Sequence, residues 1–200
     1  MGFKTIHSDV GVHILCYRQG GNTKIILILN VDDLLLSGKV QSEITDVKHQ
    51  LGNLYHMKDL GPTSSYLGIR ITRDHKNRSI WIDQEAYIKN ALKRFGLQDA
   101  NNTKTPLPAA LHLEKYEGQA TTEIFQQMIG TLIYAAIGTR PDIAFSATQL
   151  SQFNNNPSDL HIKHTKHVLR YLRGTKELHM KYDGSSNVGL IGYSHDCGEN

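Results

Sequence analysis

The stretch that most constrains this chain is ILILNVDDLLLSG, residues 26–38, in which two apolar runs flank a pair of adjacent carboxylates. Apolar runs this short, rich in Ile and Leu and bounded by polar residues, predict buried β-strands. Asp32 and Asp33 are then expected at the tip of a tight β-hairpin whose strands pair antiparallel. Two interpretations of the carboxylates remain open. One is a solvated turn, because Asp favours turns; the other is a site for Mg²⁺, which prefers one or two carboxylates plus substrate phosphates.

Composition limits the class of protein without choosing a function. The chain has 200 residues, of which 39% are hydrophobic, enough for one or two domains with a sizeable core. No apolar run reaches the roughly 18 residues of a membrane span, and the first residues lack the apolar stretch of a signal peptide. Cys16 and Cys197 are far apart in the sequence, which indicates neither a disulfide framework nor a zinc site and favours an intracellular, reducing setting. The net charge of +3 is compatible with nucleic acid but is not evidence for it.

Periodicity predicts that the first half combines strands with two helices. Three strands are expected at 10–17, 24–29 and 34–36. A helix at 42–55 follows, with an apolar stripe made of Ile44, Val47, Leu51, Leu54 and Tyr55. The segments YLGIRITR and SIWID alternate as a hairpin around DHKN. Asp83 is expected to cap the next helix and Gly96 to end it, with an inward face of Tyr87, Ile88, Ala91, Leu92 and Phe95.

The second half is predicted to be mainly helical. Residues 98–121 contain two prolines and few periodic positions, which predicts a linker and a domain boundary. Three helices are expected beyond it, at about 123–137, 141–153 and 158–173. The first of them is expected to bury Phe125, Met128, Ile129, Leu132, Ile133 and Ala136. Short strands are expected in HMKYDG and VGLIGYS, so the whole pattern predicts an α+β fold.

Six segments follow one another along the chain: VDDLLLSG, HMKDLG, YLGIRI, IKNALKRFGL, IGTLIYAAIGTRPDIAF and HTKHVLRYLRGT. In this order they resemble the Ty1/copia-type retrotransposon reverse transcriptase, over roughly residues 1–194. The resemblance implies a partial polymerase palm, an antiparallel sheet with helices, at 1–97, then the linker at 98–121 and a helical thumb-like bundle at 122–176. Residues 177–200 would be a connection and a truncated ribonuclease H stub.

The resemblance also implies site residues. Asp32 would be a metal ligand and Asp33 its supporting carboxylate, with Mg²⁺ as cofactor and Mn²⁺ as a possible substitute. Lys58 in HMKDLG would assist the leaving pyrophosphate as a general acid; the alternative is an ordinary surface lysine. The hairpin YLGIRI would grip the primer terminus through Leu67, Gly68 and Ile69. The implied partners are an RNA/DNA primer–template and deoxynucleoside triphosphates, and the implied reaction is template-directed DNA synthesis.

Three departures from the family pattern predict an incomplete enzyme. Asn30 stands where the family has Tyr before VDD. The alignment starts inside the palm, so the fingers and an earlier metal-binding Asp are expected to be missing, and no primer extension is expected from the chain alone. The sequence GYSHDCGEN has His195 where ribonuclease H has its first catalytic Asp, which predicts no ribonuclease H activity.

A basic stripe on the last predicted helix is independent of the resemblance. Its four residues fall within an arc of about 80° at 100° per residue; they are Lys163, Lys166, Arg170 and Arg173. Such a stripe can contact the phosphates of nucleic acid, and the alternative is a solvated helix face.

Other polar residues of the second half are assigned structural roles. His161, His164 and His167 have a spacing that metal ligands can use, but packing at the edge of the core is favoured. Arg140 is either a clamp at a helix entry or a nucleic-acid contact, and the clamp is favoured.

These observations predict a fragment of an RNA-directed DNA polymerase from a copia-type retrotransposon. Two alternatives remain open: a non-catalytic nucleic-acid-binding remnant, and a degenerate element without selected function. The expected setting is intracellular, in cytoplasm or nucleus, or in a virus-like particle for an intact element, with no membrane partner.

Overall fold

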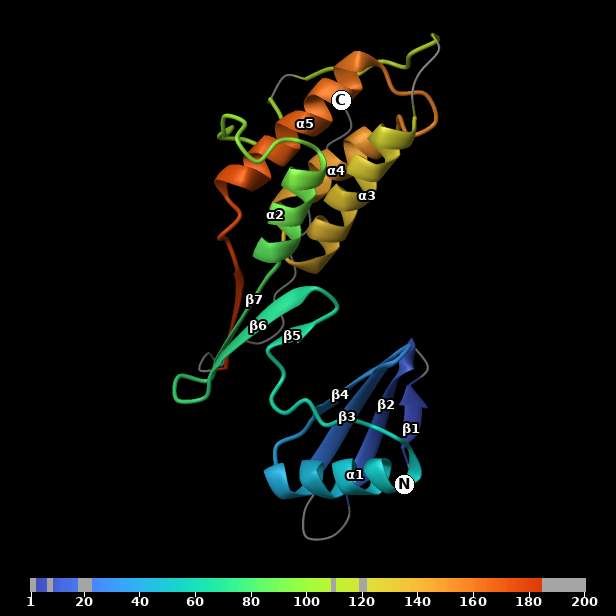
Figure 1. Ribbon diagram of the computed structural model, residues 1–200, viewed down its shortest axis with the longest axis vertical. Coiled ribbons are helices and arrows are strands. Elements are labelled where there is room, and N and C mark those ends of the chain that lie inside the picture. Colours follow the sequence, from blue (N-terminus) through green and yellow to red (C-terminus); the bar gives the residue numbers. More distant parts are fainter. Residues whose placement is uncertain (1–2, 7–8, 18–22, 109–110, 119–121, 185–200) are drawn as a thin grey trace, which may run out of the picture. The chain divides into compact units, whose positions relative to one another are not determined.

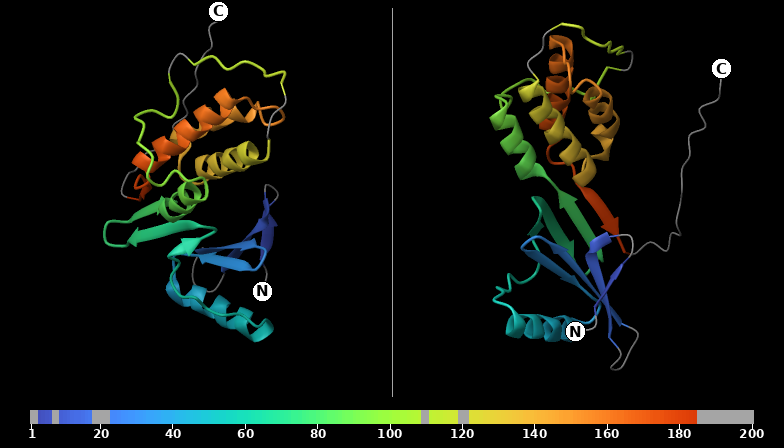
Figure 2. Two further views of the ribbon diagram at one scale, coloured as in Figure 1. Left: turned by 45° about the horizontal axis from the view of Figure 1, so that its top comes forward. Right: turned by 90° about the vertical axis from the view of Figure 1, so that its right-hand side faces the viewer.

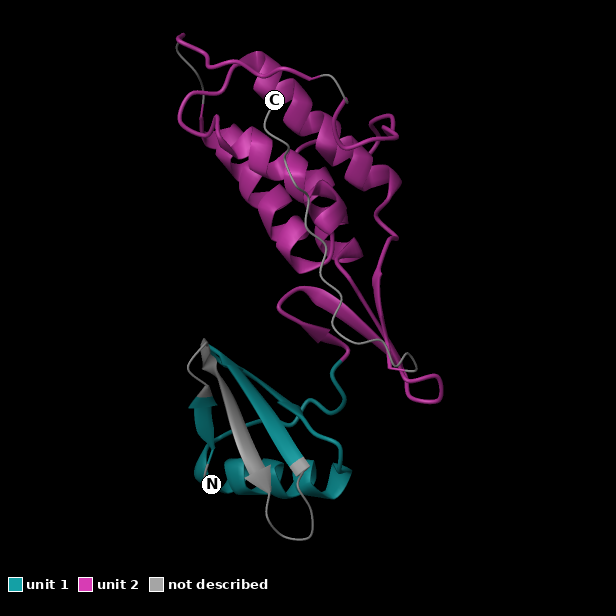
Figure 3. Cartoon of the chain, turned by 180° about the vertical axis from the view of Figure 1, so that it is seen from behind, with its two compact units in different colours: residues 1–63 teal, residues 64–200 magenta. Residues whose placement is uncertain are grey.

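The computed structural model describes residues 3–6, 9–17, 23–108, 111–118 and 122–184. The chain divides into two compact units, Met1–Thr63 (unit 1) and Ser64–Asn200 (unit 2), shown in different colours in Figure 3. Each unit holds one four-stranded antiparallel sheet together with helical structure, which confirms the predicted α+β class. None of the helices in the described ranges is long and apolar enough to cross a membrane.

Unit 1 is a sheet with one helix packed against it (Figure 1). The strands, in spatial order, are β1 (Lys4–Ile6), β2 (Asp9–Tyr17), β3 (Thr23–Asn30) and β4 (Asp33–Ser37), and α1 (Gln41–Leu54) follows them. The three predicted strands are confirmed, whereas β1 is too short to show a period in the sequence. Ile25 and Leu27 of β3 are buried against Val47 and Leu51 of α1, because alternate residues of a strand and every fourth residue of a helix share a face.

The apolar stripe predicted for α1 is correct in its middle and wrong at its end. Val47 and Leu51 are buried and Ile44 is half-buried, but Leu54 is 66% exposed and Tyr55 63% exposed. The helix ends at Leu54, and Tyr55 already has an extended backbone. Tyr55 thus leaves the helical face, and Leu54, the last helical residue, lies outside the core cluster that holds Val47 and Leu51.

Unit 2 joins a second sheet to a helical bundle. The strands, in spatial order, are β5 (Ser65–Tyr66), β6 (Ile69–Asp74), β7 (Ser79–Asp83) and β8 (Met180–Asp183). The helices are α2 (Glu85–Arg94), α3 (Glu123–Gly138), the short 3₁₀ helix η1 (Pro141–Ile143), α4 (Ala144–Ser151) and α5 (Asp159–Gly174). Figure 2 shows the four α-helices of unit 2 gathered together and β8 beside β7. The strand predicted in HMKYDG is thus confirmed, while VGLIGYS lies outside the described residues.

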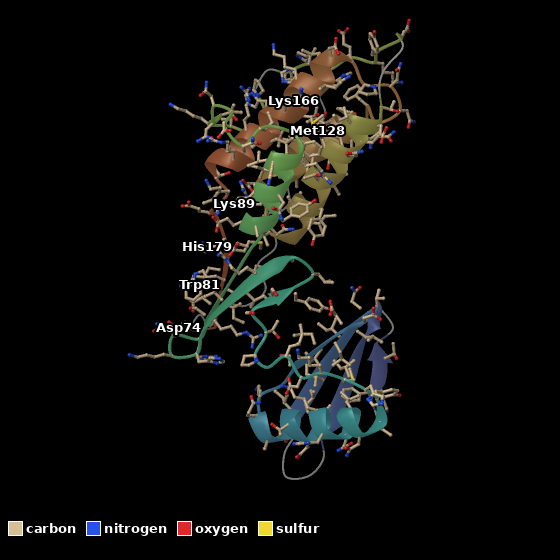
Figure 4. The ribbon with its side chains drawn as sticks, in the orientation of Figure 1. Asp74, Trp81, Lys89, Met128, Lys166 and His179 are labelled. Atoms are coloured by element: carbon tan, nitrogen blue, oxygen red, sulfur yellow. The ribbon has the colours of Figure 1, made fainter. Side chains whose placement is uncertain are left out.

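The core of the bundle comes from its helices. One cluster of buried apolar side chains contains Ile88, Leu92, Phe125, Met128, Ile129, Leu132, Ala135, Ile143, Ala147, Leu150, Val168, Leu169 and Leu172. Met128, labelled on α3 in Figure 4, is among them. The inward faces predicted for α2 and α3 are confirmed with one exception. Ile133 is exposed, because the buried face of α3 is formed by positions 125, 128, 129, 132 and 135.

Helix α2 ends as its sequence predicts. Gly96 has a φ of +64°, its N–H donates to the Lys93 carbonyl over 3.1 Å, and the Leu97 N–H donates to the Leu92 carbonyl over 2.8 Å. This is the Schellman arrangement, in which glycine takes the left-handed position. At the other end the helix cap is Gln84 and not Asp83; the Asp83 carboxylate nevertheless accepts the N–H of Glu85 over 3.1 Å.

The predicted linker does not coincide with the boundary between the units, which falls at Thr63 and Ser64. The described part of 98–121 forms neither helix nor strand, but its first residues pack along α5. The Gln98 carbonyl accepts from Arg173 over 2.6 Å, and the Thr103 hydroxyl donates to the His167 carbonyl over 3.2 Å. Because α2 also contributes to the bundle core, residues 64–97 belong with the helices, and the predicted segment 1–97 spans both units.

Candidate functional site

The adjacent carboxylates lie at a hairpin tip, as the sequence predicts. Strands β3 and β4 pair antiparallel with Asn30 opposite Asp33, which leaves Val31 and Asp32 as a two-residue turn. We call residues 30–33 the carboxylate tip. Asp32 and Asp33 are both exposed. Leu34 packs against the core beneath the sheet, so by strand alternation Asp33 points to the face opposite α1.

The carboxylate tip contains a residue in a costly conformation. Val31 has a φ of +53° and its side chain is 85% exposed, whereas Asp32 does not have a positive φ. A two-residue turn with a positive φ only at its first position favours glycine there. A left-handed conformation costs an ordinary residue about 1–2 kcal/mol, and it is a clear outlier for a β-branched one. Strain of this kind gathers at functional sites, so it marks this turn as a candidate site.

The carboxylate tip offers oxygen ligands of the type that Mg²⁺ prefers. Within the described ranges, no group of three or more His, Cys, Asp or Glu side chains is placed to hold a metal ion. A metal-binding role for Asp32 and Asp33 stays a prediction.

Lys58 lies on the segment that follows α1 and is exposed. The neighbouring Asp59 fixes this segment. Its carboxylate accepts the Gly61 N–H over 2.9 Å and pairs with Lys48 of α1 at 2.9 Å. The hydrogen bond from Gly61, followed by the one from Lys48, holds the pKa of Asp59 below its ordinary value. The HMKDLG segment thus has a structural anchor in Asp59, and a catalytic role for Lys58 stays a prediction.

The predicted primer-grip residues form a second tight turn. Tyr66 of β5 pairs with Ile69 of β6, so Leu67 and Gly68 are the two turn residues. Leu67 has a φ of +48° and Gly68 a φ of +75°. Positive φ at both positions is the type I′ hairpin turn, which favours Asn-Gly. We call residues 66–69 the β5–β6 tip. Leu67 has the same conformational cost as Val31, about 1–2 kcal/mol.

Helix α3 contacts the β5–β6 tip through a residue that sequence reasoning missed. The Tyr134 hydroxyl donates a hydrogen bond to the Leu67 carbonyl. The Tyr134 ring also packs against Tyr87 of α2, with ring centroids 4.7 Å apart. Tyr134 lies inside IGTLIYAAIGTRPDIAF, one of the six segments that carry the family resemblance. Its place in that segment was the only feature of the sequence that pointed to Tyr134.

The basic stripe of α5 is free in its first half and engaged in its second. Lys163 and Lys166 are exposed, and Lys166 is labelled on α5 in Figure 4. Arg173 instead donates to the Gln98 carbonyl and to Asn102, each over 2.6 Å. Arg170 is half-buried, and its guanidinium lies 3.5 Å from His167. Residues of the segment after α2 engage Arg173 at the helix end, which helical periodicity could not reveal, and a nucleic-acid-binding role of the stripe stays a prediction.

The histidines of α5 pack as expected. His161 is buried and its ring stacks on Phe153 at 3.9 Å between centroids. Its Nδ1 accepts the Ser158 N–H over 2.8 Å while the Ser158 hydroxyl receives the His161 N–H, which makes a capping box at the helix start. Burial lowers the pKa of His161 and, together with the neighbouring His167 and Lys163, the pKa of His164. The packing role is confirmed for His161.

Arg140 is the helix-entry clamp that the sequence favours. Its side chain is 2% exposed and holds Asp142 through two hydrogen bonds of 2.9 and 2.7 Å. It also donates to the carbonyl and hydroxyl of Thr175, at the end of α5, over 3.0 and 2.6 Å. Burial raises the pKa of Asp142, but the hydrogen bond and charge of Arg140 outweigh it, so the pKa lies below its ordinary value. Tyr171 adds a third hydrogen bond to Asp142, of 2.9 Å.

Comparison with known proteins identifies the family. The pattern described as "Reverse transcriptase (RNA-dependent DNA polymerase)" matches residues 1–109, a range that includes both hairpin tips. This chain belongs to the reverse transcriptase family. Its copia-type affiliation, expected from the six segments, is shown by relatives from such transposons.

The chain spans part of the length of two of these relatives. The chain is 39% identical to the retrovirus-related Pol polyprotein from transposon TNT 1-94 of Nicotiana tabacum, over 94% of this chain and 14% of the polyprotein. It is 31% identical to a transposon Ty5-1 protein of Saccharomyces cerevisiae, over 92% of this chain and 60% of that protein. The chain therefore spans 14% of the length of the tobacco polyprotein and 60% of the length of the yeast protein. No solved structure shows a significant match to this chain.

Proposed function

We propose that this chain supplies the metal-binding carboxylates and the primer–template contacts of an RNA-directed DNA polymerase. In this proposal unit 1, β5–β7 and α2 correspond to part of the palm, and α3–α5 correspond to the thumb. The substrates are deoxynucleoside triphosphates, and the setting is intracellular. The observation that carries the proposal is the exposed carboxylate tip in a chain of the reverse transcriptase family.

Each proposed site residue has a distinct role. Asp32 and Asp33 would hold a divalent ion, Mg²⁺ or Mn²⁺, which when bound neutralises charge on the triphosphate and on the attacking and leaving oxygens. Lys58 would donate a proton to the leaving pyrophosphate. The β5–β6 tip would contact the primer terminus. Lys163 and Lys166 would contact phosphates of the duplex, because both are exposed on one face of α5.

The metal-binding part can be tested without an activity assay. Mn²⁺ added with a deoxynucleoside triphosphate should broaden the amide NMR signals of residues 31–34, because a bound paramagnetic ion relaxes nearby nuclei. Asp32→Asn should abolish this selective broadening. The matched control is Asp46→Asn, which removes an exposed carboxylate from α1 of the same unit and should change nothing. Equal broadening at exposed acids throughout the chain would contradict a site at the carboxylate tip.

A second candidate function is nucleic-acid binding without catalysis, and the free lysines of α5 favour it. Two phosphate contacts predict a log–log slope of duplex affinity against salt of about −1.8, at about −0.9 per contact. Replacing Lys163 and Lys166 by Gln should bring that slope close to zero. The matched control is the pair Lys89→Gln and Lys93→Gln, which removes two exposed lysines of α2. Duplex binding without the Mn²⁺ effect would favour this second function, and the absence of both would contradict both.

A further inference from the structure

Tyr134 connects two elements of unit 2 that are distant in the sequence. Its hydroxyl on α3 donates to the Leu67 carbonyl, 67 residues earlier in the chain. Its ring is held at the same time by Tyr87 of α2, at an interplanar angle of 56°. The hydroxyl is therefore fixed from the helix side, and the hydrogen bond transmits that position to the β5–β6 tip.

The turn is shaped around this hydroxyl. A Cβ atom at Gly68 would lie 3.2 Å from the Tyr134 hydroxyl oxygen, closer than ordinary van der Waals contact. Gly68 also has a φ of +75°, which glycine adopts without a steric cost. Both the conformation and the close approach of Tyr134 thus require glycine at this position.

The backbone of Leu67 is in a costly left-handed conformation, and burial of its side chain does not offset that cost. Its φ is +48°, where Asn would be cheaper, and its side chain is 44% exposed and outside the core cluster of the bundle. An apolar side chain that is strained and also exposed adds little to the stability of the fold. Backbone strain gathers at functional sites, and the exposed part of the leucine side chain is accessible to a ligand.

We propose that Tyr134 is a positioning residue that holds the β5–β6 tip so that Leu67 faces the 3′-terminal nucleotide of a recessed primer. The exposed leucine packs on the sugar and base of that nucleotide, and Tyr134 keeps the strained turn from relaxing when the primer leaves. This inference rests on the proposed primer–template function. It adds to that function a residue of the helical bundle that touches no substrate and acts through the turn.

The experiment compares two duplexes of equal length, one blunt and one with a recessed primer end that carries 2-aminopurine as its last nucleotide. The unmodified chain should bind the recessed duplex more tightly and change the fluorescence of the terminal base. Tyr134→Phe keeps the ring against Tyr87 but removes the hydroxyl. It should reduce the preference for the recessed end about fivefold, the factor for one ordinary hydrogen bond. The salt slope should stay unchanged, because Lys163 and Lys166 are untouched.

A second variant separates a contact with the primer from a role in stability. Leu67→Asn supplies the residue that the turn favours, so it should raise the unfolding midpoint while it abolishes the fluorescence change. The matched control is Tyr182→Phe, which removes a hydroxyl from an exposed tyrosine of β8 and should leave the preference intact.

The inference is overturned if Tyr134→Phe or Leu67→Asn keeps the full preference for the recessed end. It is also overturned, with the proposed function left standing, if the unmodified chain binds both duplexes equally with the expected salt slope. If the chain binds neither duplex, the proposed function fails as well, so the two failures are distinguishable.

Discussion

The carboxylate tip of unit 1 and the β5–β6 tip of unit 2 are built alike and carry different residues. Each is a two-residue turn between antiparallel strands, with a bulky apolar residue, Val31 or Leu67, in the left-handed region. In the first tip the next residues are Asp32 and Asp33, both exposed. In the second the next residue is Gly68, and Tyr134 of α3 holds the turn.

The two turns differ in geometry: only the first turn residue has a positive φ in the carboxylate tip, whereas both turn residues have one in the β5–β6 tip. The first turn places Asp32 beyond the last strand pair and Asp33 within it, and both carboxylates are exposed. The other turn presents backbone and an apolar side chain, and its position is set by a helix. Because the conformational cost, about 1–2 kcal/mol, is similar in both tips, it does not reveal the function; the neighbouring side chains do.

The largest change in stability is expected from removing the Arg140 clamp of unit 2. Arg140→Gln removes a buried guanidinium that donates to Asp142 and Thr175, so it should destabilise unit 2 by about 3 kcal/mol. Urea unfolding followed by hydrogen exchange should show faster exchange in the bundle and at the β5–β6 tip, with the β3–β4 amides unchanged. Lys89→Gln, which breaks an exposed pair with Glu85, is the control and should change stability by less than about 0.5 kcal/mol. A comparable loss from both variants would contradict the clamp role of Arg140.

A smaller effect is expected from a methyl group at the anchored turn. Gly68→Ala should cost about 2 kcal/mol, of which about 1 kcal/mol is the left-handed backbone and the rest the contact with Tyr134. Gly96→Ala is a matched control, since Gly96 also has a positive φ but has open space around it, and it should cost only the backbone part. Thermal or urea unfolding measures both. If the two variants lose equal stability, Tyr134 does not restrict the turn.

Mild acid should loosen the helical bundle that anchors the second tip. The pKa values of His161 and His164 are lowered in the folded protein, mainly by burial, from the ordinary histidine value of about 6.5. Below pH 6.5 the unfolded chain therefore binds more protons than the folded protein does. Stability should therefore be full above pH 6.5 and fall as the pH drops from there through the lowered values. Protonation of His161 at Nδ1 would also remove the acceptor of the Ser158 N–H.

The variant His161→Gln tests this pH dependence. Gln keeps a neutral side chain at the capping-box position but does not titrate, so the decline of stability between pH 6.5 and 5 should become shallower. Unfolding midpoints measured across that range give the slope. An unchanged slope in this variant would assign the pH dependence to other groups.

The smallest effect is expected at the carboxylate tip. Val31→Gly removes the steric cost of the left-handed turn but adds freedom to the unfolded chain, so a net gain of about 0.5 kcal/mol is expected. Hydrogen exchange of the β3–β4 amides should slow accordingly. Mn²⁺ broadening at residues 31–34 should persist if Val31 only shapes the turn. If it disappears, the strained valine itself contributes to metal binding.

The sequence by itself determined the local elements and the family. Alternation and short apolar runs predicted the β3–β4 hairpin with Asp32 and Asp33 at its tip, and helical spacing predicted the buried faces of α2 and most of α3. Gly96 predicted the end of α2. These features depend on residues of the same element or of the next one along the chain, so the sequence alone contains them. The ordered segments carried the reverse transcriptase resemblance, which the comparisons confirm.

Only the tertiary structure decided which of these residues meet. The Tyr134–Leu67 hydrogen bond joins positions 67 residues apart. Arg173 reaches Gln98 across 75 residues, which removes Arg173 from a basic stripe that periodicity had left free. The clamp partner Thr175 lies 35 residues from Arg140, although the clamp itself was expected. The same limit explains why Leu54 is exposed despite its apolar spacing. The physical reason is that periodicity reports the face on which a side chain lies, whereas its partner depends on how distant segments pack.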